Sequence, residues 1–85
     1  MKQLIIGKAY RVKSAPNGNQ AIPLAHVEGT RYLFVNPHDS TCPFVSWDTY
    51  SLPNYTEYEI ACQSGKYYAS LKQAMTGERL LKEVI

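Results

Sequence analysis

The sequence lacks any long apolar run, which excludes a membrane-spanning helix. Such a helix needs roughly 18 consecutive apolar residues, whereas the N-terminal segment has only three, Leu4 to Ile6, before Gly7 and Lys8. A run of that length is also too short for the apolar region of a signal peptide. We therefore expect a cytoplasmic protein that makes no contact with a membrane.

Cysteine is scarce, with only Cys42 and Cys62 in 85 residues. One bridge would not make a disulfide framework, and the cytosol would keep both thiols reduced. Together with His26 and His38 they reach the ligand count of a closed tetrahedral zinc site. The sequence has no Cys-x-x-Cys pair, however, and the four residues are scattered along the chain. We therefore expect half-buried thiols and no bound metal.

The motifs of common enzyme classes are missing too. There is no phosphate-binding glycine loop, no metalloprotease motif and no paired-carboxylate pattern. Cys42 lies near His38 and Asp39 in the sequence, which supplies the atoms for a thiolate mechanism, but acidic neighbours raise the pKa of a thiol. So short a chain also leaves little room for a substrate pocket of about 300 Å3 or more. We expect a non-enzymatic protein with no catalytic residue and no cofactor.

Charge is low and unevenly distributed. The net charge of +2 at pH 7 is too small to indicate nucleic-acid binding by itself. Residues 1–27 carry four cations and no acid, residues 28–59 carry five acids and one cation, and residues 60–85 carry four cations and two acids. The three parts therefore sum to +4, −4 and +2. The acidic part overlaps the stretch that is richest in aromatic residues.

That aromatic stretch, residues 36–58, is the densest feature of the sequence. It holds three of the five prolines, the single tryptophan and five of the ten aromatic residues. Prolines at positions 37, 43 and 53 exclude one long helix or one central strand. We expect an ordered, packed loop that contains a short strand at 44–47, followed by a second loop at 48–54.

Short strands are predicted on both sides of the aromatic stretch. The segment 4–13 alternates, and its apolar face carries Leu4, Ile6, Tyr10 and Val12. A second strand is predicted at 21–27, where Pro23 cannot donate a ladder hydrogen bond and therefore requires a bulge or an edge. A third, at 31–35, has apolar residues on both faces, which indicates a central strand covered on both sides.

The C-terminal third is predicted to contain a hairpin and a helix. The segment 55–62 alternates, with Tyr58, Ile60 and Cys62 pointing inward, and a turn at 63–66 leads to a return arm at 66–69. Ser70 and Gln73 have the spacing of a capping box, so a helix should begin there. Gly77 lies where a helix C-cap belongs, and residues 78–85 are predicted to form a closing strand.

This order of elements predicts one domain spanning residues 1–85, of the α+β class and mostly β. The expected architecture is a small, strongly bent antiparallel sheet or SH3-like barrel with one short helix near the C-terminus.

Tyrosine points to the function. Seven tyrosines are more than so small a core can hide, and tyrosine and tryptophan are enriched at interface hot spots. We therefore expect a protein-interaction module, a small inhibitor or regulator of the accessory or phage type. Its acidic rim would suit a basic partner, for example a nucleic-acid-binding host protein. The expected binding residues are Trp47, Asp48, Tyr50, Leu52, Tyr55 and Glu57.

A second hypothesis is a nucleic-acid-binding small β-barrel. Such barrels bind single strands through aromatic residues interleaved with lysine and arginine. In this reading Tyr32 and Phe34 would stack on bases, while Arg11, Lys13 and Arg31 would contact phosphates. The acidic character of the aromatic stretch opposes this hypothesis, because carboxylates repel phosphate.

Overall fold

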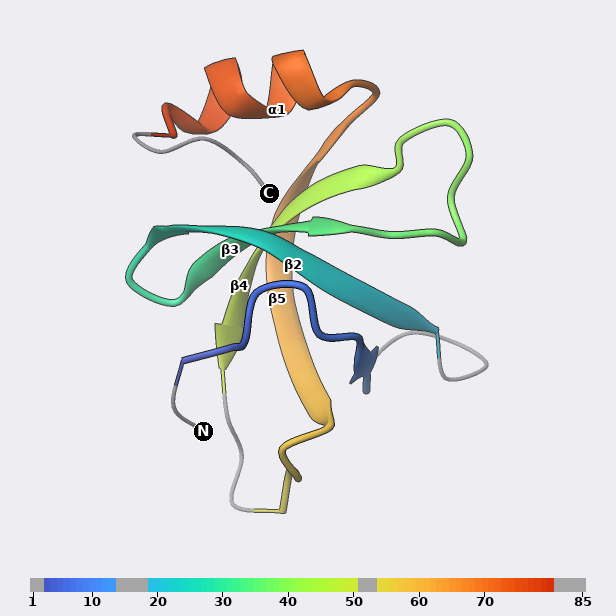
Figure 1. The fold of residues 1–85 in the computed structure, drawn as a ribbon, viewed down its shortest axis with the longest axis vertical. Helices are drawn as coiled ribbons and strands as arrows, with labels where there is room; N and C mark the ends of the chain where they lie inside the picture. Colours follow the sequence, from blue (N-terminus) through green and yellow to red (C-terminus); the bar gives the residue numbers. More distant parts are fainter. Residues whose placement is uncertain (1–2, 14–18, 51–53, 81–85) are drawn as a thin grey trace.

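The computed structural model describes residues 3–13, 19–50 and 54–80, which form five strands and one helix (Figure 1). Consecutive strands pair antiparallel, and the first strand pairs parallel with the last, which closes the sheet into a barrel. The predicted fold class, mostly β with a small bent sheet or barrel and a short C-terminal helix, is confirmed. The elements are β1 (Tyr10–Val12), β2 (Gln20–Glu28), β3 (Arg31–Val35), β4 (Phe44–Tyr50), β5 (Glu59–Tyr68) and α1 (Leu71–Glu78).

The parallel closure follows from the odd number of strands. Each connection reverses the chain direction, so in a five-strand meander the first and last strands point the same way. The closing pair is short and aligns Arg11 with Glu59 and Val12 with Ile60. The Arg11 amide donates to the Tyr58 carbonyl (2.9 Å) and the Lys13 amide donates to the Ile60 carbonyl (2.8 Å). Closure therefore places the basic N-terminal strand beside the acidic end of the aromatic stretch.

The barrel interior is filled by alternate residues of all five strands. The apolar face predicted for residues 4–13 is confirmed, because Leu4, Tyr10 and Val12 are buried and Ile6 packs against the same core. Period-two alternation in a strand points every second side chain inward, which explains this arrangement. The other buried members of this cluster are Ala21, Tyr32, Phe34, Val45 and Ile60.

The strand β3 is covered on both faces, as its composition predicts. Tyr32 and Phe34 point into the barrel, while Leu33 lies on the outer face and is also fully buried. Leu33 pairs with Ser46 of β4, which is buried as well. The helix α1 lies outside the barrel (Figure 1), where it contacts β4 and β5 and buries Ala74. The helix thus adds a second, smaller packed layer on the outside of the sheet.

The predicted hairpin at 63–69 is wrong, because β5 runs without a turn from Glu59 to Tyr68. Gly65 lies opposite Trp47 in the β4–β5 ladder, and a register shift next to this pair leaves one extra residue in β5. A β-bulge accommodates such a residue without ending the strand. Gly65 therefore marks a close approach between neighbouring strands, where the sequence was interpreted as a turn.

Two other strand boundaries differ from the prediction. The first strand begins only at Tyr10, because Ile6 and Gly7 form a turn in which Gly7 has a φ of 90°. The Gly7 amide donates to the Pro23 carbonyl (2.9 Å). A register shift follows Pro23 in β2, which confirms the predicted bulge. In the aromatic stretch, β4 continues to Tyr50, so the predicted loop at 48–54 is wrong for its first three residues.

The helix begins as predicted and ends differently. The Ser70 side chain accepts a hydrogen bond from the Gln73 amide (3.2 Å), which confirms the N-cap. Gly77 is not the C-cap, because the helix continues to Glu78 and Arg79 takes the left-handed conformation with a φ of 52°. A Cβ at Gly77 would lie 2.7 Å from the Tyr68 ring, so this glycine serves close packing. Of the strand predicted at 78–85, Glu78 is helical, Arg79 and Leu80 follow the helix, and the rest lies outside the described residues.

The N-cap carries a prediction for stability. Ser70→Ala is expected to lower the free energy of unfolding by about 1 kcal/mol, because the Gln73 amide loses its acceptor at the start of a short helix. Urea-induced unfolding followed by circular dichroism measures this change. Ser70→Thr keeps the hydroxyl and serves as the control. An unchanged urea midpoint in Ser70→Ala would mean that the cap does not contribute to the stability of the domain.

Candidate functional site

Trp47, expected at the centre of the binding surface, is largely a packing residue. It is half-buried and lies against the barrel core. Its ring centroid is 5.5 Å from that of Phe34 and 6.1 Å from that of Tyr67, which it meets edge-on. Such tilted and edge-to-face geometries stabilise aromatic pairs. Trp47 therefore links the core to the exposed Tyr67 and presents little free surface.

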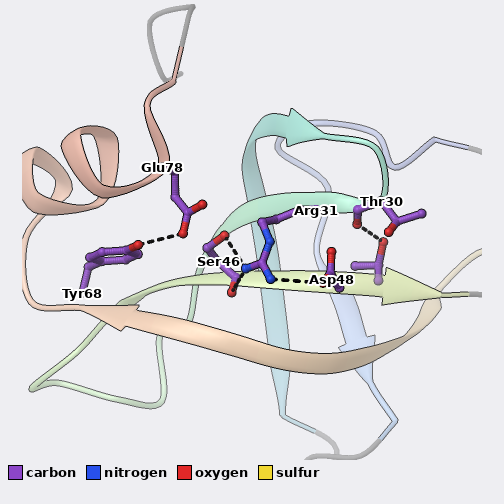
Figure 2. A network of polar contacts seen from close by, with 7 residues as sticks. Thr30, Arg31, Ser46, Asp48, Tyr68 and Glu78 are labelled. Carbon is purple, nitrogen blue, oxygen red and sulfur yellow. Dashed lines mark hydrogen bonds and ion pairs between the residues drawn. The ribbon is translucent and has the colours of Figure 1, made fainter.

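Asp48 and Arg31 belong to a polar network on the outer face of the sheet (Figure 2). The Arg31 guanidinium donates to the Asp48 carboxylate (3.0 Å), and to the carbonyl (3.0 Å) and hydroxyl (3.1 Å) of Ser46. These bonds satisfy the buried Ser46 hydroxyl. The network therefore holds β3 against β4. It engages Asp48, a predicted protein-binding residue, and Arg31, a predicted phosphate-binding residue, in contacts within the fold.

A second polar contact joins the helix to the sheet (Figure 2). The Tyr68 hydroxyl donates to the Glu78 carboxylate (2.7 Å). Partial burial and this hydrogen bond raise the pKa of Tyr68 to about 12. The contact is structural, because it fixes the end of α1 over β5.

Tyr32 and Phe34 are both in the barrel core, with 4% and 0% of their surfaces exposed. The Tyr32 hydroxyl accepts a hydrogen bond from the Leu4 amide (3.2 Å). A base cannot stack on either ring while the barrel is closed. Tyr32 and Phe34 therefore cannot have the stacking role that the nucleic-acid hypothesis gave them, because both lie on the face of β3 that points into the barrel.

An exposed surface lies instead along the junction of β1 and β5. We call it the tyrosine seam. It is built from residues on both sides of the parallel closing pair, and Arg11 forms an ion pair there with Glu59 across 48 positions of sequence. The tyrosine seam comprises Lys8, Arg11, Lys13, Tyr50, Tyr55, Glu57, Tyr58 and Glu59.

Lysine ammonium groups lie over the tyrosine rings of the seam. The Lys8 Nζ is 4.4 Å from the ring centroid of Tyr58, and the Lys13 Nζ is 5.1 Å from that of Tyr55. Both distances are within the range of cation–π attraction. Tyr58 is 59% exposed and Tyr50 is 44% exposed. The seam therefore exposes aromatic side chains, and lysine ammonium groups lie over two of their rings.

The pKa shifts of the seam agree with this arrangement. A hydrogen bond with Glu57 raises the pKa of Tyr58. Partial desolvation, together with the nearby Tyr50, raises the pKa of Tyr55. Tyr50 pairs with Ala61 of β5, next to Ile60 of the closing pair, and so lies at the edge of the seam. The Arg11 guanidinium lowers the pKa of Glu59. At neutral pH Tyr55 and Tyr58 are therefore neutral and Glu59 is ionised.

The acidic rim expected from the sequence is mostly engaged within the chain. Asp48 pairs with Arg31, and Glu59 pairs with Arg11. The Asp39 carboxylate accepts bonds from the amides of Cys42 and Thr41 (both 3.0 Å), which lower its pKa. Three of the acids around the aromatic stretch are thus already satisfied by their own fold.

The structure brings together only part of the expected site. Tyr55 and Glu57 lie on the tyrosine seam and Tyr50 lies at its edge, while Leu52 lies outside the described residues. Arg11 and Lys13, assigned to the nucleic-acid hypothesis, join them on the same surface.

Sequence reasoning missed Lys8 and Tyr58. Tyr58 was predicted to point inward by alternation with Ile60, but β5 begins only at Glu59 and Tyr58 lies in the preceding turn. Nothing in the local pattern around Lys8 signals its contact with Tyr58, because that contact depends on barrel closure.

The histidines and cysteines do not converge. The His26 ring bonds to the Gly29 carbonyl (2.7 Å), and His38 Nε2 accepts a hydrogen bond from the Gln20 amide (3.4 Å). Both cysteines are unpaired thiols. Within the described ranges, no group of three or more potential ligands could hold a metal ion.

Burial of Cys62 carries a prediction for its reactivity. Desolvation raises the pKa of the Cys62 thiol to about 12. Because the thiolate is the reactive form, and a more basic thiolate is a somewhat better nucleophile, we expect alkylation at pH 8 on the order of 50-fold slower in the folded protein than in urea. Mass spectrometry of the Cys42→Ser variant measures this rate. Equal rates in the two states would contradict the burial of the thiol.

The protein is therefore a small closed β-barrel with exposed tyrosines on one surface, where lysines lie over the tyrosine rings. No helix in the described part of the chain is long and apolar enough to cross a membrane. Comparison of the chain with protein-family models, curated sequences and solved structures found no match.

Proposed function

We propose that this protein is a non-enzymatic protein-interaction module, a small regulator or inhibitor that binds its partner through the tyrosine seam. The observation that carries the proposal is the exposure of Tyr58. Its side chain is 59% exposed, although the Lys8 ammonium group lies over its ring. Tyrosines bury large area at low conformational cost, which suits them to interface hot spots.

The hydrogen bonds and the ion pair across the seam support the same proposal. Its two sides are joined by backbone hydrogen bonds of β1 with β5 and by the Arg11–Glu59 ion pair. Preorganised surfaces lose less entropy on binding than flexible ones. A partner would therefore meet the Tyr58 side chain on a backbone whose carbonyl and amide groups are both already hydrogen-bonded.

The charges of the seam change the partner expected from the sequence. The seam combines Lys8, Arg11 and Lys13 with Glu57 and Glu59, so it is mixed and slightly basic where the sequence predicted an acidic rim. A strongly basic partner would be repelled by the lysines. We propose a partner surface that is neutral or acidic.

A variant pair tests the proposal. Tyr58→Ala is expected to weaken binding by about 2 kcal/mol, the threshold of an interface hot spot. The matched control is Tyr67→Ala, because Tyr67 is also exposed (53%) and lies on β5 against Trp47, away from the closing strand. Affinity purification from bacterial lysate, with and without nuclease, compares the proteins that each variant retains.

The expected result is a protein retained by the parent and by Tyr67→Ala and lost by Tyr58→Ala, with no effect of nuclease. Retention that disappears on nuclease treatment would favour the nucleic-acid hypothesis. Equal loss in both tyrosine variants would show that the seam has no special role.

A further inference from the structure

We propose that the tyrosine seam binds an acidic, extended polypeptide segment whose carboxylates contact Lys8 and Lys13. This inference rests on the proposed function and specifies the chemistry of the partner. The observation behind it is that the fold pairs some of its charged side chains in ion pairs and leaves others without one.

The two lysines have no carboxylate partner among the described residues. The ion pairs there are Arg11–Glu59 and Arg31–Asp48, whereas the ammonium groups of Lys8 and Lys13 lie over tyrosine rings, and Lys13 is near Glu59 without pairing with it. A tyrosine ring is a weak counterpart for an ammonium group. Each lysine can therefore add a charge-assisted bond to an incoming carboxylate while keeping its ring contact.

The spacing of the lysines suits an extended segment. They lie five positions apart on either side of Arg11, so their backbones are separated by at most about 17 Å. Carboxylates four to six residues apart on an extended strand cover a similar distance. Beside Lys8, the exposed part of Tyr58 offers an apolar contact for a side chain next to one of the acids.

The same surface disfavours a phosphate chain. Glu57 and Glu59 lie among the cations, and the paired Arg11 is already neutralised. A nucleic acid carries a negative charge at every nucleotide and meets these carboxylates wherever it follows the seam. A peptide can leave neutral residues opposite Glu57 and Glu59, so its charges match the seam where a phosphate chain does not.

A titration monitored by two-dimensional NMR tests the inference with defined probes. The probes are a short peptide of alternating glutamate and serine, the same peptide with glutamine in place of glutamate, and oligothymidylate of matched length, all at low salt. The acidic peptide is expected to shift the amide resonances of residues 8–13 and 55–59, and the glutamine peptide is not.

Matched lysine variants connect the shifts to the seam. The Lys8→Ala and Lys13→Ala double variant is expected to bind the acidic peptide about five to ten times more weakly, since each exposed ion pair contributes modestly. The control is the Lys66→Ala and Lys72→Ala double variant, which removes two exposed lysines of β5 and α1 and should bind as the parent does.

Three outcomes would overturn the inference: no shift with the acidic peptide, equal weakening in both double variants, or tighter binding of oligothymidylate at the same residues. The first two leave the Tyr58 and Tyr67 comparison intact, because a neutral partner surface could still use the tyrosines. If the acidic peptide binds but Tyr58→Ala and Tyr67→Ala retain the same proteins, the proposed function would instead be contradicted.

Discussion

Replacement of Phe34 by alanine is expected to lower the free energy of unfolding by about 3–5 kcal/mol. Phe34 is fully buried in the barrel, where its ring centroid lies 5.5 Å from that of Trp47 and 6.2 Å from that of Tyr32. Alanine would leave a cavity in a closed sheet whose walls are joined by hydrogen bonds on all sides. Such walls relax little, so most of the cavity cost would remain.

Urea-induced unfolding, followed by the fluorescence of Trp47, measures this effect. Phe44→Ala is the control, because Phe44 is half-buried on β4 and its truncation should cost clearly less. A small domain has only about 5–15 kcal/mol of stability, so Phe34→Ala could be unfolded from the start. Phe34→Leu then gives a measurable, smaller loss. Equal costs at positions 34 and 44 would contradict the position of Phe34 at the barrel centre.

Gly65→Ala is expected to cost about 3 kcal/mol, at the upper end of the range for overpacked sites. A Cβ at this position would lie 2.6 Å from the Trp47 Nε1 atom and 2.7 Å from the Ser46 carbonyl oxygen. Trp47 cannot easily move, because its ring packs against Phe34 on one side and Tyr67 on another. The clash would therefore be relieved by shifting β5 away from β4.

A double-mutant cycle separates this clash from other effects of adding a methyl group. In a Trp47→Leu background the ring is absent, so Gly65→Ala should cost at least about 1 kcal/mol less than in the parent. The Ser46 carbonyl remains close and accounts for the rest. An unchanged cost in both backgrounds would mean that Trp47 does not cover Gly65.

The features that could be predicted from the sequence are those determined by neighbouring residues. The strand at 31–35 was predicted at its observed bounds because β-branched and aromatic residues fill it on both faces. The Ser70 cap was identified because its partner Gln73 is three positions away. In both cases the controlling interaction lies within a few residues.

Gly65 shows why other features could not be predicted. Ser64 and Gly65 have the composition of a turn, and nothing nearby in the sequence indicates otherwise. The reason for this glycine is the ring of Trp47, which lies across the ladder and 18 positions earlier in the chain. Gly77 is similar, since its role is set by the ring of Tyr68.

The charge of the candidate surface could not be predicted for the same reason. Summing charge over thirds of the chain indicated an acidic aromatic surface, but Arg11 neutralises Glu59 across 48 positions and Arg31 neutralises Asp48. Composition also could not distinguish the exposed Tyr58 from the buried Tyr32. Tyr32 points into the barrel from β3, whereas Tyr58 lies in the turn before β5, so the difference depends on where the strands begin.

The parallel closure has a consequence for how this protein folds and responds to a partner. The two sides of the tyrosine seam belong to opposite ends of a five-strand meander, so the seam exists only while β1 and β5 are paired. Folds that depend on contacts of such large sequence separation form slowly. A molecule that binds the seam would recognise only the fully closed barrel and would stabilise the entire domain through linkage. Loss of the three-residue strand β1 from the barrel would separate the two sides of the seam and weaken the binding of that molecule.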